Sequence, residues 1–500
     1  MKKWILSSVF AASTLLASAT VDLHYGGEAL VATGTGDFAP YYTSALRHGR
    51  LTQSTTLLGE VSAWVPMRLD CRFSWGACVD LVADYGSSVE YARYNPNGWS
   101  THKEHPAPFW IQQAFAELKY RGVFLTVGAK EHGSALLNQL LSSGDLVESG
   151  NARPIPEARA GFVDFQNIPF TNGWVQIQGE IGWGKMTDSD WWADRYNRYN
   201  YHIVSGEWYN YKRCYFRTKP SQPLSVTVGM QAAVTFGGTV ETWREGVSIR
   251  SRKHDVNFKS FLNSWLPMPG GEEFYEGNHL GSWDFVARYR FASGQQLRAY
   301  FQWPWEDGSG IGRRNGWDGL WGIEWTRPDR SWITGAVIEL LEFTNQSGPQ
   351  HFAPGDLPGG TITSESTGAD DYYNNAMYNS YAYYGLSIGT PALMAPLYNR
   401  DGYPAYIGNR LRGFHAAATG FITDGLSWRL RAGYRKAWGN GMLALPKPVH
   451  LTSVSLDVDW QLPRIKGLSV NGAIAIDRGT MPCNAFGITI GVKYNGLLKL

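Results

Sequence analysis

The stretch Leu224-Ser-Val-Thr-Val-Gly-Met-Gln-Ala-Ala-Val-Thr-Phe236 decides the fold of this chain. Every second residue from Leu224 to Phe236 is apolar, and the residues between them are small or polar. Successive side chains of an extended strand point to opposite faces, so a period of two predicts a strand with one apolar and one polar face.

The same alternation recurs along the chain. Turn signals such as Asp424-Gly425 and Asn440-Gly441 separate the alternating segments, as expected for antiparallel hairpins. Further segments with this pattern are Val175–Trp183, Leu426–Tyr434, Val454–Leu462, Leu468–Ile476 and Phe486–Tyr494.

Two fold classes compete for this pattern. A soluble sandwich or propeller also alternates, but its solvent face commonly carries Lys and Glu, and a propeller shows a repeat of roughly 40–50 residues. Here the strands run to about ten residues or more, with aromatic residues such as Phe236, Trp303, Trp460 and Tyr494 near their ends. We therefore predict an all-β fold, a transmembrane antiparallel β-barrel with lipid outside and a polar lumen.

Composition excludes several other classes. The 500 residues are 43% hydrophobic, which excludes a disordered tail, and no stretch of the mature chain is long enough to span a membrane as a helix. Without Lys2 and Lys3 the chain carries 43 basic and 43 acidic residues, so no bulk positive charge is available for binding nucleic acid.

Residues 1–19 have the pattern of a secretory signal peptide. Lys2 and Lys3 precede an apolar run, and Ala17-Ser-Ala19 fits the small-x-small rule for cleavage near Ala19. Residues 20–500 show no linker between two compositionally distinct parts, so we expect a single barrel domain. Leucines at 132–149 and aromatic residues at 255–265 follow helical spacing and predict two inserted helices, while residues 345–372 predict a long loop.

Four cysteines remain, at Cys71, Cys78, Cys214 and Cys483, and their spacing matches no zinc motif. A tight turn at Ser74-Trp75 would place Cys71 opposite Cys78. In an oxidising compartment the two would form a disulfide or remain free thiols, and the sequence leaves both alternatives open.

An ordered set of segments resembles the capsule assembly Wzi family in its Bacteroidetes-type form. No single segment is diagnostic, and the resemblance rests on their order across most of the chain. The segments are Thr33-Gly-Thr-Gly-Asp-Phe-Ala-Pro-Tyr-Tyr42, Leu141-Ser-Ser-Gly144, Ser149-Gly-Asn-Ala-Arg-Pro-Ile-Pro156, Gly277-Asn-His-Leu-Gly-Ser-Trp-Asp-Phe285, Glu306-Asp-Gly-Ser-Gly-Ile-Gly312, Asp318-Gly-Leu-Trp-Gly-Ile-Glu324 and Tyr384-Gly-Leu-Ser-Ile-Gly-Thr-Pro391.

The resemblance implies an outer-membrane barrel of about eighteen strands whose helical elements block or line the lumen. It also implies a lectin-like protein of a Gram-negative outer membrane that holds surface polysaccharide without a catalytic step. The implied partners are capsular or other surface polysaccharide, outer-membrane lipid and the barrel-assembly machinery. Neither a cofactor nor a metal is expected, because His102, His105 and His132 match no metal-ligand spacing.

Candidate sugar-binding residues combine aromatic rings with hydrogen-bonding side chains. Rings pack on the apolar C–H faces of sugars, and carboxylate, amide and guanidinium groups bond to hydroxyls. Interfacial aromatics and solvated loops are the alternative interpretation of the same residues. The candidates are Asn278, His279, Trp283, Asp284, Trp305, Glu306, Asp307, Arg313, Arg314, Asp318, Asp371 and Tyr372.

Two arginine rows have the spacing of one strand face: Arg429, Arg431 and Arg435, and separately Arg288 and Arg290. If these faces line a lumen, they would attract acidic polysaccharide. Alternatively, they pair with acids on adjacent strands, such as Asp457 and Asp459.

Two other functions stay open from the sequence. An open barrel would be a diffusion channel for saccharides, whereas a plugged one would conduct poorly. A membrane hydrolase would need a catalytic set such as His279, Ser282 and Asp284, but no Gly-x-Ser-x-Gly elbow surrounds the serine.

Overall fold

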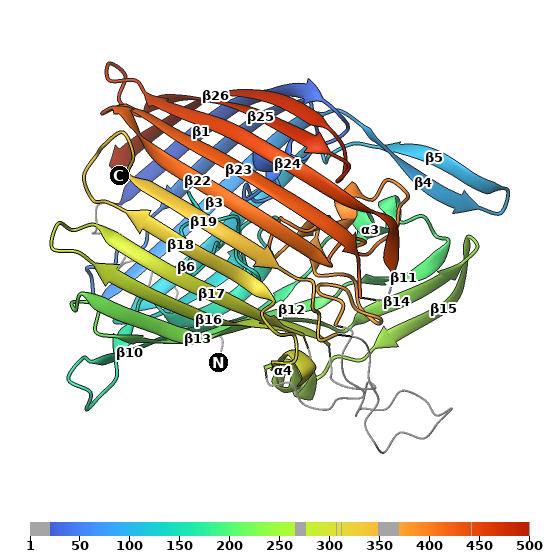
Figure 1. Cartoon of the computed structure of the whole chain (residues 1–500), viewed down its shortest axis with the longest axis horizontal. Coiled ribbons are helices and arrows are strands. Elements are labelled where there is room, and N and C mark those ends of the chain that lie inside the picture. Colours follow the sequence, from blue (N-terminus) through green and yellow to red (C-terminus); the bar gives the residue numbers. More distant parts are fainter. Residues whose placement is uncertain are drawn as a thin grey trace, which may run out of the picture.

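The computed structural model describes residues 21–265, 277–306, 308–311, 313–348, 370–441 and 443–499. It is a closed antiparallel β-barrel of 18 strands (Figure 1). Each strand pairs with the next strand of the wall, and β1 (Asp22–Thr35) closes the barrel by pairing with β26 (Ala485–Lys499). The predicted fold class is therefore confirmed, while the signal peptide lies outside the described residues.

The wall strands follow the chain order. β8 and the two-residue β9 (Gln166–Asn167) both pair with β10 and together form one position in the wall. The remaining strands are β2 (Thr56–Val65), β3 (Phe73–Gly86), β6 (Phe109–Tyr120), β7 (Val123–Ala129), β8 (Pro156–Phe162), β10 (Val175–Lys185), β12 (Trp208–Thr218), β13 (Leu224–Phe236), β16 (Asn278–Arg290), β17 (Gln296–Trp305), β18 (Gly319–Thr326), β19 (Gly335–Glu342), β22 (Leu411–Thr423), β23 (Leu426–Gly439), β24 (Ala444–Gln461) and β25 (Leu468–Gly479).

The two ends of the barrel differ in the length of their connections. At one end, where β1 begins and β26 ends, turns such as 121–122 and 424–425 are short. At the other end, 130–155 joins β7 to β8 and 343–410 joins β19 to β22. Outer-membrane barrels have short periplasmic turns and long extracellular loops, so we assign the long-loop end to the extracellular side.

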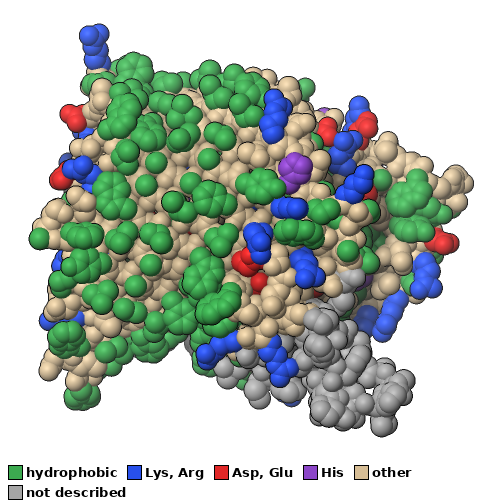
Figure 2. Space-filling model, viewed as in Figure 1, with side chains coloured by type: hydrophobic (Ala, Val, Ile, Leu, Met, Phe, Trp, Pro, Cys, Tyr) green, Lys and Arg blue, Asp and Glu red, His purple; other side chains and the backbone are tan. Residues whose placement is uncertain are grey.

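Side chains on neighbouring positions of the wall point to opposite environments. Ser455 of β24 is 1% exposed and faces the interior, whereas Leu456 beside it is 43% exposed. Leu224 and Leu430 are exposed, while Gln231 and Arg431 are buried. Figure 2 shows hydrophobic side chains spread across the wall and charged ones gathered mostly towards its ends. The predicted apolar outer face is therefore confirmed, whereas the inner face is mixed, because inward residues such as Leu320 and Val337 are apolar and buried beside polar ones.

Small elements decorate the long-loop end, as Figure 1 shows. A hairpin of β4 (Val89–Asn95) and β5 (Gly98–Glu104) projects there, beside a sheet of β11 (Asn200–Ser205), β14 (Gly238–Arg244) and β15 (Val247–His254). The other elements are α2 (Tyr41–Ser44), α3 (Ser189–Arg195), α4 (Phe258–Trp265), α5 (Gly308–Ile311), β20 (Ala382–Tyr383), β21 (Leu386–Ser387) and the 3-10 helix η1 (Pro396–Tyr398). No helix among the described residues is long and apolar enough to cross a membrane.

Three segments fold back into the lumen, and we call residues 36–55, 130–155 and 370–410 the plug. Its aromatic and aliphatic side chains form one hydrophobic core with inward residues of the wall. Glu339 of β19 accepts hydrogen bonds from Ser142 Oγ and from the Ser143 amide, both at 2.7 Å. His415 of β22 contacts Tyr42 Oη at 2.7 Å and the Leu141 carbonyl at 2.8 Å. The plug is thus tied to the adjacent wall strands β19 and β22, where Glu339 and His415 are paired in register.

The plug is not helical, and the predicted helix at 132–149 is wrong. Gly144 has φ +120°, and the Asp145 carboxylate accepts hydrogen bonds from the Val147 and Glu148 amides. These local bonds replace helical ones. The leucines that suggested a helix, Leu137, Leu141 and Leu146, are apolar because they are buried inside the lumen as part of its hydrophobic core. The predicted long loop at 345–372 falls mostly outside the described residues.

The second predicted helix, 255–265, corresponds to α4 but lies on the outside of the wall. The Phe261 ring meets those of Trp208 and Phe236 at centroid distances of 5.1 and 5.5 Å. Phe236 shares the outward face of Leu224, so α4 covers the extracellular end of that face and does not enter the lumen.

The predicted turn at Ser74-Trp75 is also wrong, because both residues lie inside the continuous strand β3. An extended strand separates Cys71 from Cys78, and both cysteines are free thiols. Cys214 and Cys483 are free as well.

Candidate functional site

A cavity of about 220 Å³ opens at the extracellular end of the barrel. This volume is many times the roughly 15 Å³ that one water molecule needs. Its deep residues, such as Trp110, are buried, while His105 and Asp194 at its rim are exposed. We call it the rim pocket, and it is lined by Gly49, Arg50, Thr52, Gln53, Asp84, Glu104, His105, Pro106, Ala107, Trp110, Arg153, Trp191, Asp194, Arg195, Tyr384, Leu386 and Leu397.

Aromatic rings and an arginine form the inner wall of the rim pocket. The Arg153 guanidinium lies 4.0 Å from the ring centroid of Trp110 and 4.6 Å from that of Tyr384. Gly49, with φ +72°, allows this approach, because a Cβ there would lie only 2.9 Å from Arg153 Cγ. Burial lowers the pKa of Arg153 to about 10, so the guanidinium remains charged at neutral pH.

Helix α3 contributes Trp191, Asp194 and Arg195 to the lining of the pocket. Arg195 lies 4.9 Å from the Trp191 ring centroid, pairs with Glu104 at 3.6 Å and donates to the His105 carbonyl at 3.1 Å. The Trp191 ring rests against Gly385, where a Cβ would lie 2.0 Å from it. A glycine is therefore required at 385 to admit the indole.

Asp188 positions two sides of this pocket. Its carboxylate accepts hydrogen bonds from Trp192 Nε1 and from the Tyr384 amide, both at 2.9 Å, and so joins α3 to the plug. Burial raises the pKa of Asp188 to about 7. Aromatic residues of the rim pocket are thus held by a carboxyl group that titrates near neutrality.

Two charged side chains of the pocket have unused hydrogen-bonding capacity. Arg153 forms neither an ion pair nor a hydrogen bond with any residue that the structure describes. Asp84 is 8% exposed, and its Oδ1 has no hydrogen-bond partner within the described part of the chain. Rings beside unpaired polar groups are the chemistry that carbohydrate hydroxyls and carboxylates require.

The residues predicted from sequence do not line the rim pocket. Five of them join a hydrogen-bonded network where the plug meets the extracellular ends of the strands. Tyr372 Oη donates to Asp318 at 3.0 Å, Asn375 Nδ2 donates to Asn278 at 3.1 Å, and Asn409 Nδ2 donates to Asp371 at 2.6 Å. The Tyr373 amide donates to Glu306. These groups use much of their polar capacity within the protein.

Other predicted residues lie on the outside of the barrel or in an exposed loop. Trp283 is paired in register with Trp303 on the outward face, as in an aromatic girdle. His279 and Trp305 share that outward face by strand alternation and are buried. Arg313 and Arg314 are exposed, and Asp307 lies outside the described residues.

The remaining candidate, Asp284, is fully buried inside the lumen. It accepts hydrogen bonds from Tyr215 Oη at 2.6 Å, Ser282 Oγ at 2.7 Å and Gln231 Nε2 at 3.0 Å. Because Ser282 donates directly to Asp284, while His279 belongs to the opposite face of β16, the three side chains are not arranged as a relay of serine, histidine and acid.

The arginines of β23 also point inward. Asp457 of the adjacent strand β24 forms ion pairs with Arg431 at 2.9 Å and with Arg429 at 3.4 Å. The alternative that these arginines pair with acids on an adjacent strand is therefore confirmed for these two. Arg435 donates to the Ala392 carbonyl at 2.6 Å and lies 3.7 Å from the Tyr41 ring centroid. The second pair lies at the short-turn end, where Arg288 donates to the Pro220 carbonyl and Arg290 to that of Ser221.

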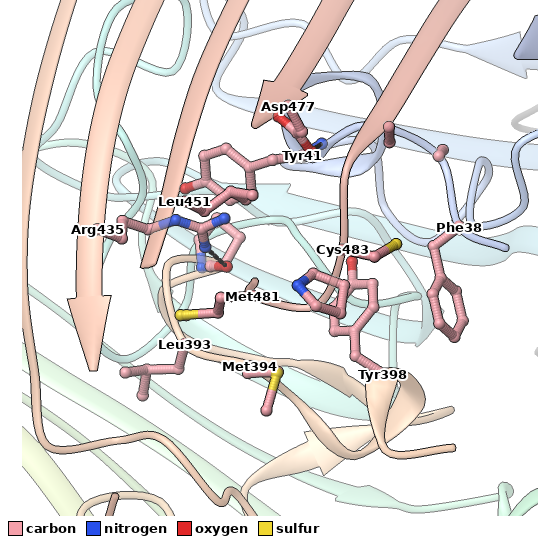
Figure 3. A pocket seen from close by; sticks show the side chains of 14 residues that line it. Phe38, Tyr41, Leu393, Met394, Tyr398, Arg435, Leu451, Asp477, Met481 and Cys483 are labelled. Carbon is pink, nitrogen blue, oxygen red and sulfur yellow. Dashed lines mark hydrogen bonds between the residues drawn. The ribbon is translucent and has the colours of Figure 1, made fainter. Parts of the chain in front are cut away.

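Figure 3 shows Arg435 and Tyr41 converging from wall and plug on a small cavity, with Asp477 above them. Its volume is about 20 Å³, enough for about one water molecule. The Tyr41 amide donates to Asp477 at 2.7 Å. The plug is therefore closely packed here, in contrast to the rim pocket.

Among the described residues, no group of three or more His, Cys, Asp or Glu side chains is arranged to hold a metal ion. Sequence reasoning missed the rim pocket because its residues come from six separate segments. One signal was available: Asp188-Ser-Asp-Trp-Trp-Ala-Asp-Arg195 combines the aromatic, acidic and basic types used to choose the other candidates.

These features define an outer-membrane β-barrel with a plugged lumen and a polar, aromatic pocket at its extracellular end. No protein-family model and no curated protein matches the chain. Among solved structures it is similar to Wzi of Escherichia coli, an outer membrane protein involved in group 1 capsule assembly and a carbohydrate-binding β-barrel. The identity is 13%, the TM-score is 0.55, and the match covers 96% of this chain and 86% of that one.

Two further solved structures align over a similar length but with lower structural agreement. Pseudomonas aeruginosa OccK5 is 10% identical with a TM-score of 0.44, covering 95% of this chain and 98% of its own. Acinetobacter baumannii OccAB2 is 9% identical with a TM-score of 0.45, covering 96% and 98%. At these identities the comparisons show the barrel fold alone.

Proposed function

We propose that this barrel binds surface polysaccharide at the rim pocket, without catalysis, and helps to assemble or anchor a capsule on a Gram-negative cell. The observation that carries the proposal is the combination of Trp110, Trp191 and Tyr384 with polar groups of Arg153 and Asp84 that have no hydrogen-bond partner among the described residues. The pocket faces outward from the cell, where an exported polysaccharide is present. The barrel likeness to a carbohydrate-binding protein supports the same role.

The packed plug favours this role over a saccharide channel. Wall residues on separate strands, Glu339, His415 and Arg431, all hold plug segments by hydrogen bonds. A binding protein needs a rigid extracellular surface, whereas a diffusion channel needs a continuous aqueous path. We therefore propose low conductance for the purified protein in planar bilayers.

Candidate residues that were predicted from sequence, although they lie outside the rim pocket, support it structurally or extend its surface. Asp318, Tyr372 and Asn278 fix the plug to the strand ends, and the exposed Arg313 and Arg314 could contact a long chain that continues beyond the pocket. Outer-membrane lipid and the barrel-assembly machinery remain the proposed partners of the wall.

Deletion of the gene in the native host tests the role. We expect polysaccharide to move from the cell-attached fraction into the medium with total synthesis unchanged, and wild-type protein to restore attachment. A variant carrying Trp110→Ala and Trp191→Ala should reach the outer membrane in normal amounts and fail to restore it. A normal attached layer in the deletion strain, together with purified protein that ignores the host polysaccharide, would show that the role is wrong.

A further inference from the structure

The rim pocket contains a cation, Arg153, that forms no ion pair within 4.0 Å with any residue that the structure describes. Arg50 is engaged by Glu60 at 2.6 Å and Asp80 at 3.1 Å, and Arg195 is paired with Glu104 at 3.6 Å. Arg153 differs, because it contacts rings and, within the described residues, has no acidic partner closer than 4.0 Å. Asp84 acts on this charge only from beyond ion-pair distance, so the half-buried guanidinium lacks the close counter-ion that a ligand carboxylate would supply.

From this arrangement we infer that the rim pocket is selective for an acidic saccharide, whose carboxylate binds Arg153 while a hydroxyl of the same sugar donates to the Asp84 carboxylate. The inference rests on the proposed function and adds the class of sugar to it. A guanidinium presents a planar fork of N–H donors that matches the two oxygens of a carboxylate. The rings of Trp110 and Tyr384 hold the Arg153 head in place, so little rotamer freedom is lost on binding.

The acidic groups around the pocket limit what it can accept. Asp84, Glu104 and Asp194 all line it, and Glu104 already neutralises Arg195. A polymer with several sulfates on each sugar would bring some of them against these carboxylates, whereas one carboxylate per sugar can reach Arg153 and leave hydroxyls for Asp84. The pocket therefore distinguishes an acidic sugar from both a neutral sugar and a densely sulfated one.

Calorimetric titration with the host polysaccharide tests this inference in three arms. The first arm uses the native polymer, the second uses the polymer after carbodiimide activation and borohydride reduction of its carboxylates to alcohols, and the third uses dextran sulfate. We expect wild-type protein to bind the native polymer at least tenfold more tightly than either of the others. One charge-assisted bidentate contact of about 1.5–3 kcal/mol corresponds to roughly 10- to 150-fold.

Substitutions at the cation give an independent readout. R153M should lose tenfold or more in affinity for the native polymer and change little for the reduced one, while R153K should lose less. K103M, which removes an exposed cation paired with Glu90 at 3.8 Å on the nearby hairpin, is the matched control and should bind normally.

Equal binding of native and reduced polymer overturns the acidic selectivity and leaves the proposed function standing. Equal or tighter binding of dextran sulfate overturns the preference for a carboxylate. Absence of binding to every polymer contradicts the proposed function itself. Since the reduction arm uses wild-type protein, it decides the question even if R153M fails to fold.

Discussion

Asp145 fixes the plug to the wall, and replacing it should release the plug. Its carboxylate accepts five hydrogen bonds: from Ser134, Val147 and Glu148 within the plug, and from Gln231 and Gln302 of the wall at 2.7 and 2.9 Å. Asp145 is fully buried, and burial raises its pKa. D145A would remove all five bonds at once.

The size of the effect follows from these contacts. Five bonds to a carboxylate at about 1.5–3 kcal/mol each would total roughly 10 kcal/mol, but removing a buried carboxylate also relieves its desolvation. Gln231 retains a bond to Asp284 at 3.0 Å, and Gln302 Oε1 still accepts from the Leu146 amide at 3.1 Å. We therefore expect about 4 kcal/mol of destabilisation, concentrated in the plug.

Planar-bilayer recording with thermal unfolding measures this directly. Wild-type barrels should conduct poorly, and D145A should show frequent open events and a lower unfolding temperature. D424A, which removes a side chain 98% exposed in a short turn, is the matched control and should resemble wild type. If D145A stays closed and unfolds at the wild-type temperature, the carboxylate does not anchor the plug.

Three further predictions follow from the structure. W191A removes one aromatic ring of the rim pocket and should weaken polysaccharide binding about fivefold, since such a ring contact contributes about 1 kcal/mol. W174A, which removes a tryptophan at a periplasmic turn, is the control and should bind with normal affinity in the same titration. Equal affinities of the two variants would contradict binding at the pocket. I490R places a charge on a lipid-facing position that is 59% exposed and should lower the free energy of unfolding in lipid vesicles by about 2–4 kcal/mol in urea titrations, whereas an unchanged value would mean that Ile490 does not face lipid. Asp188 should make α3 less stable as pH rises. The Asp188 carboxyl keeps its proton up to about pH 7 in the native state but only up to about pH 4 in the unfolded state. Between these pH values the native state binds more protons than the unfolded state, so its stability decreases as pH increases. Hydrogen exchange of residues 187–196 should therefore be slower at pH 5 than at pH 8 after correction for intrinsic rates, with the difference abolished in D188N; protection that grows with pH would refute the sign.

The wall could be predicted from sequence because strand alternation is local. In Val454–Leu462 and Leu426–Tyr434 the polarity of each residue indicates which face of the strand it occupies. The outward face of these two segments lacks Lys and Glu, which indicates that it contacts lipid and not water. Pairing in the sheet then joins each strand to the next along the chain, so no long-range information was needed for the topology.

The plug could not be predicted in this way, because it is irregular and its side chains are buried on all sides. Leu137, Leu141 and Leu146 imitate helical spacing, while the decisive contacts of Asp145 with Gln231 and Gln302 join residues far apart in sequence. The rim pocket is hidden for the same reason. Trp110, Arg153 and Tyr384 meet only after the barrel closes.

The candidate residues were chosen by residue type alone, and the structure places them in different surroundings with different roles. Asp318 and Tyr372 bond to each other and to the plug, whereas Trp283 belongs to the outer girdle. The same residue types therefore fulfil structural roles in one place and remain unpaired in the rim pocket. The rim pocket differs because Arg153 and Asp84, which lack hydrogen-bond partners among the described residues, line an open cavity of about 220 Å³.

A structure of the protein in a lipid nanodisc, determined with a saturating oligosaccharide cut from the host polysaccharide, tests the central claim most directly. Our account predicts sugar density within the rim pocket, against Trp191 and Tyr384, with one ring contacting Arg153. Sugar density running through the lumen past a displaced plug, or bound only to the outer loops away from Trp110, would contradict it.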